Sequence, residues 1–198
     1  EVIFAQIAGG GNLGESRLAA VSLLKKSVRF AQKMYKENFN PPKILLPLPA
    51  PLAAELDREI ILSWGNDIEK VKGIENAGSS FYSFQGYNVY QISKNETTLG
   101  EKKLIAAFDI KDNRQSYLDE EVDPLQGYVS IADKGFGSDS GIQRFISIKK
   151  DYLNETTLNN GSDYDFGVSY FYLADDYNFP YSYLESPVST VSVKPQSP

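Results

Sequence analysis

In this 198-residue chain, the clustered carboxylates are one group of side chains that could have a chemical role. They gather between residues 109 and 123, and the pair Asp175-Asp176 follows a later apolar run. Carboxylate and loop carbonyl oxygens are the ligands that Ca²⁺ prefers, but none of these acids follows the spacing of an EF-hand loop. Solvated loop charge is the commoner cause of such a cluster, so we expect no cofactor and keep calcium as the alternative. The calcium candidates are Asp109, Asp112, Asp119, Glu121 and Asp123.

The chain contains no His and no Cys, so any catalysis would rest on carboxylates, Ser, Lys or Tyr. The absence of His and Cys excludes Cys nucleophiles, Ser-His-Asp triads, Cys/His zinc sites and disulfide bonds. Two carboxylates at a suitable separation are enough to hydrolyse a glycosidic bond, but nothing in the sequence sets such a separation. We therefore expect that the protein is not an enzyme.

Aromatic rings in two polar segments are the better functional clue. The segments 174–183 (ADDYNFPYSY) and 81–87 (FYSFQGY) are dense in Tyr and Phe beside Asp, Asn and Ser. Flat rings with polar neighbours suit sugar stacking or protein contacts. The alternative is that both segments fold over the domain and bury their rings there. The candidate binding residues are Tyr177, Phe179, Tyr181 and Tyr183.

A glycine motif at 9–14 (GGGNLG) formally matches the G-x-G-x-x-G fingerprint of dinucleotide-binding proteins. It follows the apolar segment Val2–Ala8 and precedes a helical pattern, as that fingerprint requires. That pattern, however, leads into PPKILLPLPAP rather than into a second parallel strand, and no further βαβ unit follows. We interpret the motif as a turn between a strand and a helix.

The overall charge limits the kinds of partner. The net charge of −6 argues against nucleic acid and against anionic membrane surfaces. No apolar run approaches the roughly 20 residues of a membrane span, so we expect no membrane insertion. The chain begins at Glu1, without Met and inside what looks like a strand, and we interpret it as a piece of a longer protein.

The elements that would position these residues begin with a helix over residues 16–39. Ser16 is suited to cap its start, and Pro41-Pro42 ends it. Barely three heptads fit, which favours a helix docked on its own domain over a coiled-coil or partner helix. Its apolar stripe, at spacings of three and four, consists of Leu18, Val21, Leu24, Val28, Ala31 and Tyr35.

The residues after this helix have a pattern that predicts an antiparallel β-sandwich. Ile60, Leu62 and Trp64 alternate with more polar positions, as in a strand with one buried face. Before it, the proline-rich segment 41–56 is typical of a stiff linker that runs into an edge strand. Turn-rich gaps separate the predicted strands, which is typical of a mostly β fold. These strands are 58–64, 84–93, 102–110, 141–150, 164–173 and 185–194.

Four signals along the chain resemble the fibronectin type III family. A strand that ends in Trp64, followed by one that contains Tyr87 and Val89, resembles strands B and C. The segment 158–164 (LNNGSDY) resembles the Leu-x-Pro-Gly-x-x-Tyr start of strand F, with Asn160 in place of the usual proline. The resemblance implies that the hydroxyl of its tyrosine bonds back to upstream backbone. The segment 185–189 (ESPVS) resembles the start of strand G.

The size of the matched region departs from that family. Modules of this sandwich class have about 100 residues, and the matched span is about half as large again. The extra length falls in 66–83, 111–140 and 174–183. Enlarged modules of this kind resemble those of large secreted or cell-surface bacterial proteins, including ones exported by type IX secretion. The resemblance implies a sandwich over 41–195, preceded by a strand, glycine turn and helix over 1–40 that end a preceding domain or form a linker.

These features together predict a non-catalytic structural or interaction module that serves spacing, docking or assembly, and the resemblance implies that it lies outside the cell, in a secreted or cell-surface protein. Its partners would be other protein domains or chains of the same assembly. One alternative is a carbohydrate-binding accessory module that holds polysaccharide with the loop aromatics. A second is a filament subunit, in which Val2–Ala8 adds to a neighbour's sheet edge.

One prediction concerns the side of the sheet that faces away from the core. If Leu62, Trp64, Tyr87 and Val89 face the core, many other apolar residues face outward. Together they form more apolar surface than a soluble protein usually exposes to water. We therefore expect either the helix 18–35 or the insertion 111–140 to cover one outer face. The predicted outward residues are Ile61, Tyr90, Ile92, Ile105, Ala107, Phe171 and Leu173.

Overall fold

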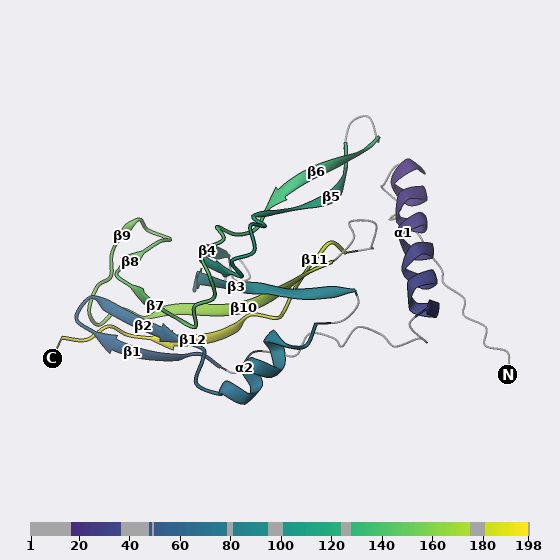
Figure 1. Cartoon of the computed structure of the whole chain (residues 1–198). Helices are drawn as coiled ribbons and strands as arrows, with labels where there is room; N and C mark the ends of the chain where they lie inside the picture. Colours follow the sequence, from purple (N-terminus) through teal and green to yellow (C-terminus); the bar gives the residue numbers. More distant parts are fainter. Residues whose placement is uncertain are drawn as a thin grey trace.

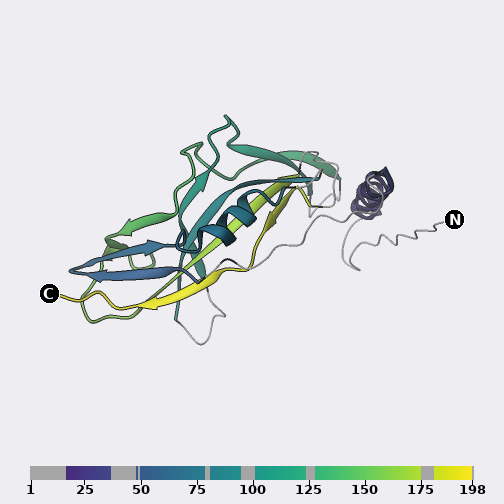
Figure 2. The same ribbon diagram turned by 60° about the horizontal axis from the view of Figure 1, so that its bottom comes forward.

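The computed structural model describes residues 17–36, 48, 50–78, 81–94, 101–123, 128–174 and 181–197. Helix α1 (Arg17–Lys36) confirms the described part of the predicted helix. The predicted strand Val2–Ala8 and the glycine motif at 9–14 lie outside the described residues, as does half of the proline-rich segment. Figures 1 and 2 show α1 at one end of an elongated body of strands.

The first sheet contains three antiparallel strands in the order β1-β2-β7. They are β1 (Leu52–Leu56), β2 (Glu59–Ser63) and β7 (Phe145–Ile148). Only Asp57 and Arg58 join β1 to β2, and Arg58 has a φ of 53°. Such left-handed backbone is typical of two-residue hairpin turns. The predicted edge strand before residue 57 is therefore confirmed as β1.

The second sheet is built around two long strands, β3 (Tyr82–Ile92) and β10 (Tyr164–Ala174). Beyond β3 lies β4 (Lys102–Asp109). The opposite edge of β10 pairs with β12 (Ser189–Val193) along its first half and with β11 (Tyr183–Glu185) near its end. All pairings are antiparallel, and the two sheets enclose one core, which confirms the predicted antiparallel β-sandwich.

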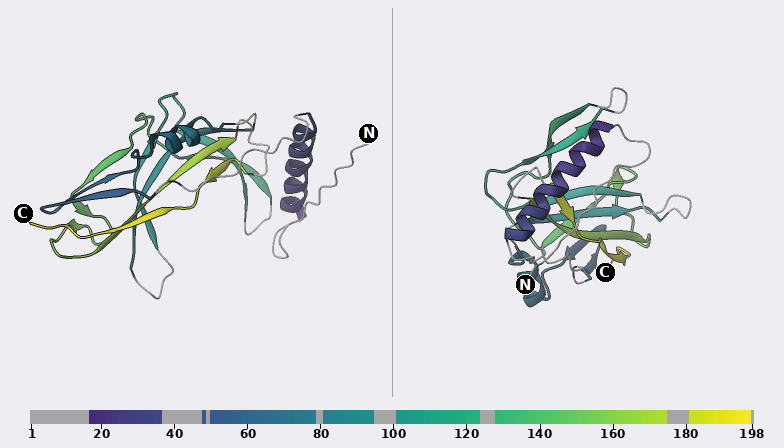
Figure 3. Two further views of the ribbon diagram at one scale, coloured as in Figure 1. Left: turned by 90° about the horizontal axis from the view of Figure 1, so that it is seen from below. Right: turned by 90° about the vertical axis from the view of Figure 1, so that its right-hand side faces the viewer.

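Beyond Val193 the chain leaves the second sheet and runs beside the first. The backbone N–H of Lys194 donates to Glu55 Oε1 at 3.0 Å, and that of Gln196 donates to the carbonyl of Leu56 at 3.3 Å. The C-terminal residues thus join the two sheets at the end of the molecule that lies opposite α1 (Figure 3).

Five smaller elements lie in stretches that the sequence pattern left as loops or parts of strands. Helix α2 (Ile68–Glu75) follows β2, and β5 (Ser116–Val122) pairs with β6 (Val129–Gly135) to form a hairpin. Strands β8 (Lys150–Asp151) and β9 (Thr156–Thr157) form a two-residue ladder near the C-terminal end. The insertions at 66–83 and 111–140 therefore contain regular structure of their own.

The core forms where the predicted alternation places it. Leu62, Trp64, Tyr87 and Val89 are at most 1% exposed. The Trp64 ring lies 5.9 Å from the Tyr87 ring and 6.0 Å from the Phe108 ring, between centroids. These contacts join the first sheet to the middle of the second.

One predicted orientation is wrong. Opposite Val89 and Tyr90, strand β4 carries an extra residue, so its register against β3 shifts there. In such a bulge two successive residues oppose a single residue of the partner strand, so the alternation of side chains between the two faces is interrupted at Ile105. Ile105 consequently packs against the core rather than facing outward.

The hydrogen bond that the fibronectin type III resemblance implied for Tyr164 is present. Its hydroxyl accepts the backbone N–H of Asn159 at 2.9 Å. Asn160, which stands where that family has proline, accepts the backbone N–H of Arg58 at 2.8 Å through Oδ1. The loop before β10 is therefore fixed both to its own strand and to the β1–β2 turn.

Replacing Tyr164 by Phe is expected to lower the free energy of unfolding by about 1 kcal/mol, because the change removes the acceptor of the Asn159 backbone N–H. Urea unfolding measures the change. Tyr128→Phe, at a tyrosine that is 48% exposed, is the matched control. A loss for Tyr164→Phe no larger than for the control would show that this bond does not stabilise the corner.

Candidate functional site

The β5–β6 hairpin covers part of the outer face of the second sheet, the face turned away from β1, β2 and β7 (Figure 1). Phe171 and Leu173 point outward from β10, yet both are fully buried. The Phe171 ring lies 5.6 Å from the Phe136 ring, which belongs to the segment after β6, and 5.2 Å from the Tyr183 ring. The prediction of a covered outer face is confirmed, and the insertion 111–140 is the cover.

Asp109 holds this cover in place. Its side chain is fully buried, and its two oxygens accept the backbone N–H groups of Ser138 at 3.1 Å and Asp139 at 2.8 Å. A Cβ atom on Gly137 would lie 2.4 Å from the Asp109 carboxyl carbon, so only glycine fits there. Asp109 therefore serves as a loop anchor.

The other calcium candidates are spread along the insertion. Asp112 accepts hydrogen bonds from Gln85 Nε2 at 2.9 Å and from the backbone of Arg114. Asp119 accepts the Ser182 hydroxyl at 3.1 Å. Glu121 and Asp123 lie farther along, at the end of β5. Among the described residues no group of three or more acidic side chains has the arrangement of a metal site. Calcium binding stays an untested prediction.

Tyr183 packs between the second sheet and the β5–β6 hairpin. Its ring stacks between Phe171 and Tyr117, the latter at 5.5 Å, and its hydroxyl accepts a hydrogen bond from Asn88 Nδ2 at 2.7 Å. Tyr181, by contrast, is 66% exposed. Tyr177 and Phe179 lie outside the described residues. Of the candidate binding aromatics that the structure describes, only Tyr181 is displayed to solvent. In the second aromatic segment Phe81, Tyr82, Phe84 and Tyr87 are all buried.

Buried tyrosines in this region stay protonated. Burial raises the pKa of Tyr183, and the nearby Glu185 carboxylate raises it further. Burial also raises the pKa of Tyr90, whose hydroxyl donates to Glu185 Oε1 at 2.6 Å. At neutral pH these phenols act as hydrogen-bond donors or acceptors and not as general bases.

Helix α1 contacts the rest of the domain through both polar and apolar side chains. Lys26 is only 5% exposed, and its ammonium group lies 3.5 Å from Asp119 Oδ1 and 3.8 Å from Glu120 Oε2. The Ser22 hydroxyl also donates to Glu120. One turn beyond Lys26, the Phe30 ring lies 5.5 Å from the Phe81 ring. Ser22, Lys26 and Phe30, spaced by four residues, form one docked face of the helix.

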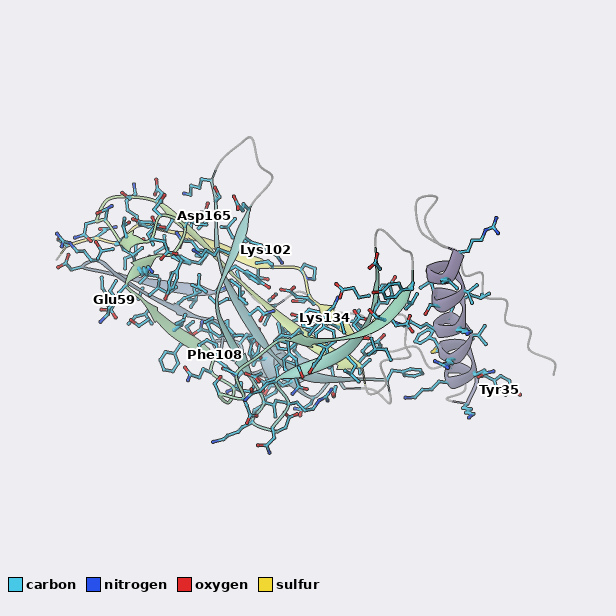
Figure 4. All side chains as sticks on the ribbon, turned by 90° about the horizontal axis from the view of Figure 1, so that it is seen from above. Tyr35, Glu59, Lys102, Phe108, Lys134 and Asp165 are labelled. Carbon is cyan, nitrogen blue, oxygen red and sulfur yellow. The ribbon has the colours of Figure 1, made fainter. Side chains whose placement is uncertain are left out.

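The apolar stripe of α1 lies on the other side of the helix. Leu18 and Tyr35 are 58% and 67% exposed, and only Ala31 of the stripe is half-buried. The helix does dock on its own domain, as expected, but through the face opposite the stripe. Figure 4 shows Tyr35 on the side of α1 turned away from the sandwich. The remaining stripe residues, Val21, Leu24 and Val28, are 44–47% exposed.

Exposed apolar side chains concentrate around this helix. Of fourteen large exposed hydrophobic residues in the described part of the chain, nine lie on α1, in or beside the β5–β6 hairpin, or at Tyr181. We call these segments together the α1 end. A large exposed apolar surface on a folded domain commonly marks an interaction site. Besides the stripe, its exposed members are Leu118, Tyr128, Ile131 and Tyr181.

Sequence reasoning missed the two features that build the α1 end. Lys26 was one of several helix lysines, and its burial requires the carboxylates of β5, which are 93 residues away in the chain. The β5–β6 pairing was hidden because the hairpin is polar and its faces differ little in hydrophobicity. The one available signal was that α1 contains six basic and no acidic residues.

Comparison with known proteins identifies no relative: no protein-family model, no curated protein and no solved structure matches this chain. None of the helices in the described residues is long and apolar enough to cross a membrane.

Proposed function

We propose that the chain is a non-catalytic interaction module of a secreted or cell-surface protein, and that it docks other domains or chains of the same assembly through its α1 end. The observation that carries this proposal is the orientation of α1. The helix holds its own domain through the docked face that contains Ser22, Lys26 and Phe30, and it presents its apolar stripe to the outside. A helix whose apolar face is left exposed is suited to helix-in-groove or helix-on-sheet recognition.

The strand arrangement supports the fibronectin type III-like character of the module. Strands β3, β10 and β12, which correspond to the predicted C, F and G, are neighbours in one sheet. The predicted strand B, β2, belongs to the other sheet. This distribution is that of immunoglobulin-type sandwiches. A rigid sandwich suits spacing and docking, because the loops and the helix at its ends are held in fixed positions.

The two alternatives receive less support. Sugar stacking would have to rely on Tyr181, since Tyr183 stacks within its own chain. For strand addition, the exposed edge of β4 carries Lys102, Lys103 and a bulge, which are features that discourage edge pairing.

The double substitution Val21→Gln and Val28→Gln tests whether the stripe is a docking surface. We expect the free energy of unfolding to change by less than about 0.5 kcal/mol, because both sites are exposed and Gln favours helix more than Val does. Amide hydrogen exchange within α1 should be equally unchanged, whereas binding of an apolar fluorescent dye should fall.

Phe30→Gln, on the docked face of the same helix, is the matched comparison. It should accelerate exchange throughout α1, because it removes the ring contact with Phe81. If the stripe variant accelerates exchange as much as Phe30→Gln does, the stripe stabilises the fold and the proposed docking surface is refuted.

A further inference from the structure

A second apolar surface lies on the outer face of the first sheet. Leu52, Ser63 and Phe145 lie side by side there, followed by a row with Ala54 and Ile61. Leu52 is 59% and Phe145 is 60% exposed. We call Leu52, Ala54, Ile61 and Phe145 the first-sheet patch.

The first-sheet patch and the α1 stripe cannot meet within one molecule. Strands β1, β2 and β7 lie toward the end of the body that is opposite to α1 (Figures 1 and 3). The two surfaces are nevertheless complementary in kind, because the apolar stripe of a helix and the apolar face of a sheet are the two surfaces that layered folds bury against each other.

Charge favours pairing of the stripe with the body of another copy and opposes pairing of two stripes. Helix α1 carries six basic and no acidic residues, while the whole chain carries −6, so the rest of the chain carries −12. The basic side chains Lys25, Arg29 and Lys36 are exposed beside the stripe. Two α1 helices packed together would bring like charges into contact. The first-sheet patch instead shares its face with Glu59 of β2, which pairs with Lys149 at 3.4 Å, and it lies on a body that is negative overall.

We propose that the α1 stripe of one copy of this chain packs on the first-sheet patch of a second copy, head to tail. The inference deepens the proposed function, since it rests on the α1 end being a docking surface and names the partner. Such a contact joins two different surfaces, so every dimer keeps one free stripe and one free patch, to which further copies can add.

The contact is small. A helix of 20 residues is about 30 Å long and about 10 Å wide, so each side contributes on the order of 300 Å². Interfaces below about 1,200 Å² in total are weak. We therefore expect concentration-dependent association, with a weight-average mass that rises gradually and does not stop at a dimer.

Light scattering over about a hundredfold range of protein concentration tests the inference. Leu52→Lys with Phe145→Lys should raise the dissociation constant about tenfold or more, because lysines there repel the basic helix. Leu52→Glu with Phe145→Glu removes the same apolar area but attracts α1, so its effect should be smaller. Leu104→Lys, at a residue of β4 that is 50% exposed and outside the patch, is the matched control and should change nothing.

A mixing experiment tests the head-to-tail arrangement. The stripe variant (Val21→Gln, Val28→Gln) keeps its patch, and the patch variant (Leu52→Lys, Phe145→Lys) keeps its stripe. Each alone should be monomeric, and their equimolar mixture should form dimers that do not extend, because each dimer lacks a second competent pair of surfaces.

Each contrary result has one meaning. A wild-type chain that stays monomeric at all concentrations overturns the head-to-tail inference. A closed dimer that survives the patch variant also overturns it and indicates stripe-to-stripe pairing. In either case the proposed function stands if the hydrogen-exchange comparison on α1 gives its expected result, so the two proposals fail separately.

Discussion

Asp109→Ala is expected to lower the free energy of unfolding by about 2–3 kcal/mol, because it removes a buried carboxylate that accepts two backbone N–H groups. Those groups belong to Ser138 and Asp139, in the segment that leaves β6. Without the Asp109 carboxylate, the hairpin loses its anchor on the second sheet. Phe171, which the segment after β6 covers, should then become accessible to solvent. Urea unfolding and dye binding measure the two effects.

Two further variants make this experiment selective. Asp109→Asn keeps one acceptor oxygen, so its loss should lie between that of wild type and that of Asp109→Ala. Asp133→Asn, at an exposed aspartate of the same hairpin, should leave stability unchanged within about 0.5 kcal/mol. An Asp109→Ala chain as stable as Asp133→Asn would refute the role of Asp109 as the anchor.

Glu75→Ala should also cost about 2–3 kcal/mol of unfolding free energy, because it leaves a buried hydroxyl and a cation without their acceptor. Glu75 Oε1 accepts the Tyr87 hydroxyl at 2.7 Å and Arg144 Nε at 2.9 Å. Its Oε2 accepts Arg144 Nη2 at 2.6 Å, which completes a bidentate pair. The carboxylate thereby connects α2 to the core ring Tyr87 and to the start of β7.

Trp64 is the only tryptophan of the chain and packs against Tyr87, so its fluorescence reports this change directly. Glu75→Gln keeps an acceptor for Tyr87 but loses the ion pair with Arg144, and its loss should be smaller. Glu69→Ala, at an exposed position in the first turn of α2, is the control. Equal losses for Glu75→Ala and Glu69→Ala would contradict the proposed link between α2 and the sheets.

The strands that depend on a local pattern were predictable from the sequence. The alternation in 58–64 sets which side chains of β2 are buried, and the turn before Tyr164 is a short-range motif with its own hydrogen bond. The covered outer face was also predictable, because Phe171 and Leu173 are too apolar to be left in water.

The unpredicted parts depend on contacts between distant segments. Helix α2 has eight residues and buries only Val71 and Ile74, too few for a helical period to stand out. The orientation of Ile105 follows from a bulge that exists only once β4 is paired with β3. The docked face of α1 follows from Lys26 meeting carboxylates of β5, which no local pattern indicates.

The candidate site was predictable in location more than in role. Among the described candidates, Asp119 pairs with Lys26 of α1 and Tyr183 stacks on Tyr117 of β5, whereas Asp109 lies at the end of β4. Yet a buried acceptor such as Asp109 and a solvated acid such as Glu121 cannot be told apart by residue type, because both are carboxylates on strands. Burial and hydrogen-bond partners separate them, and these require the fold.

The C-terminal residues that run from β12 alongside β1 determine how the domain would respond to mechanical load. They leave the body at the end opposite α1, so tension between α1 and the C-terminal end is directed along the length of β12 (Figure 1). The five residue pairs between β12 and β10 would then be sheared together, and no single pair at the end would be peeled off first. A head-to-tail row of such modules would carry tension along its strands.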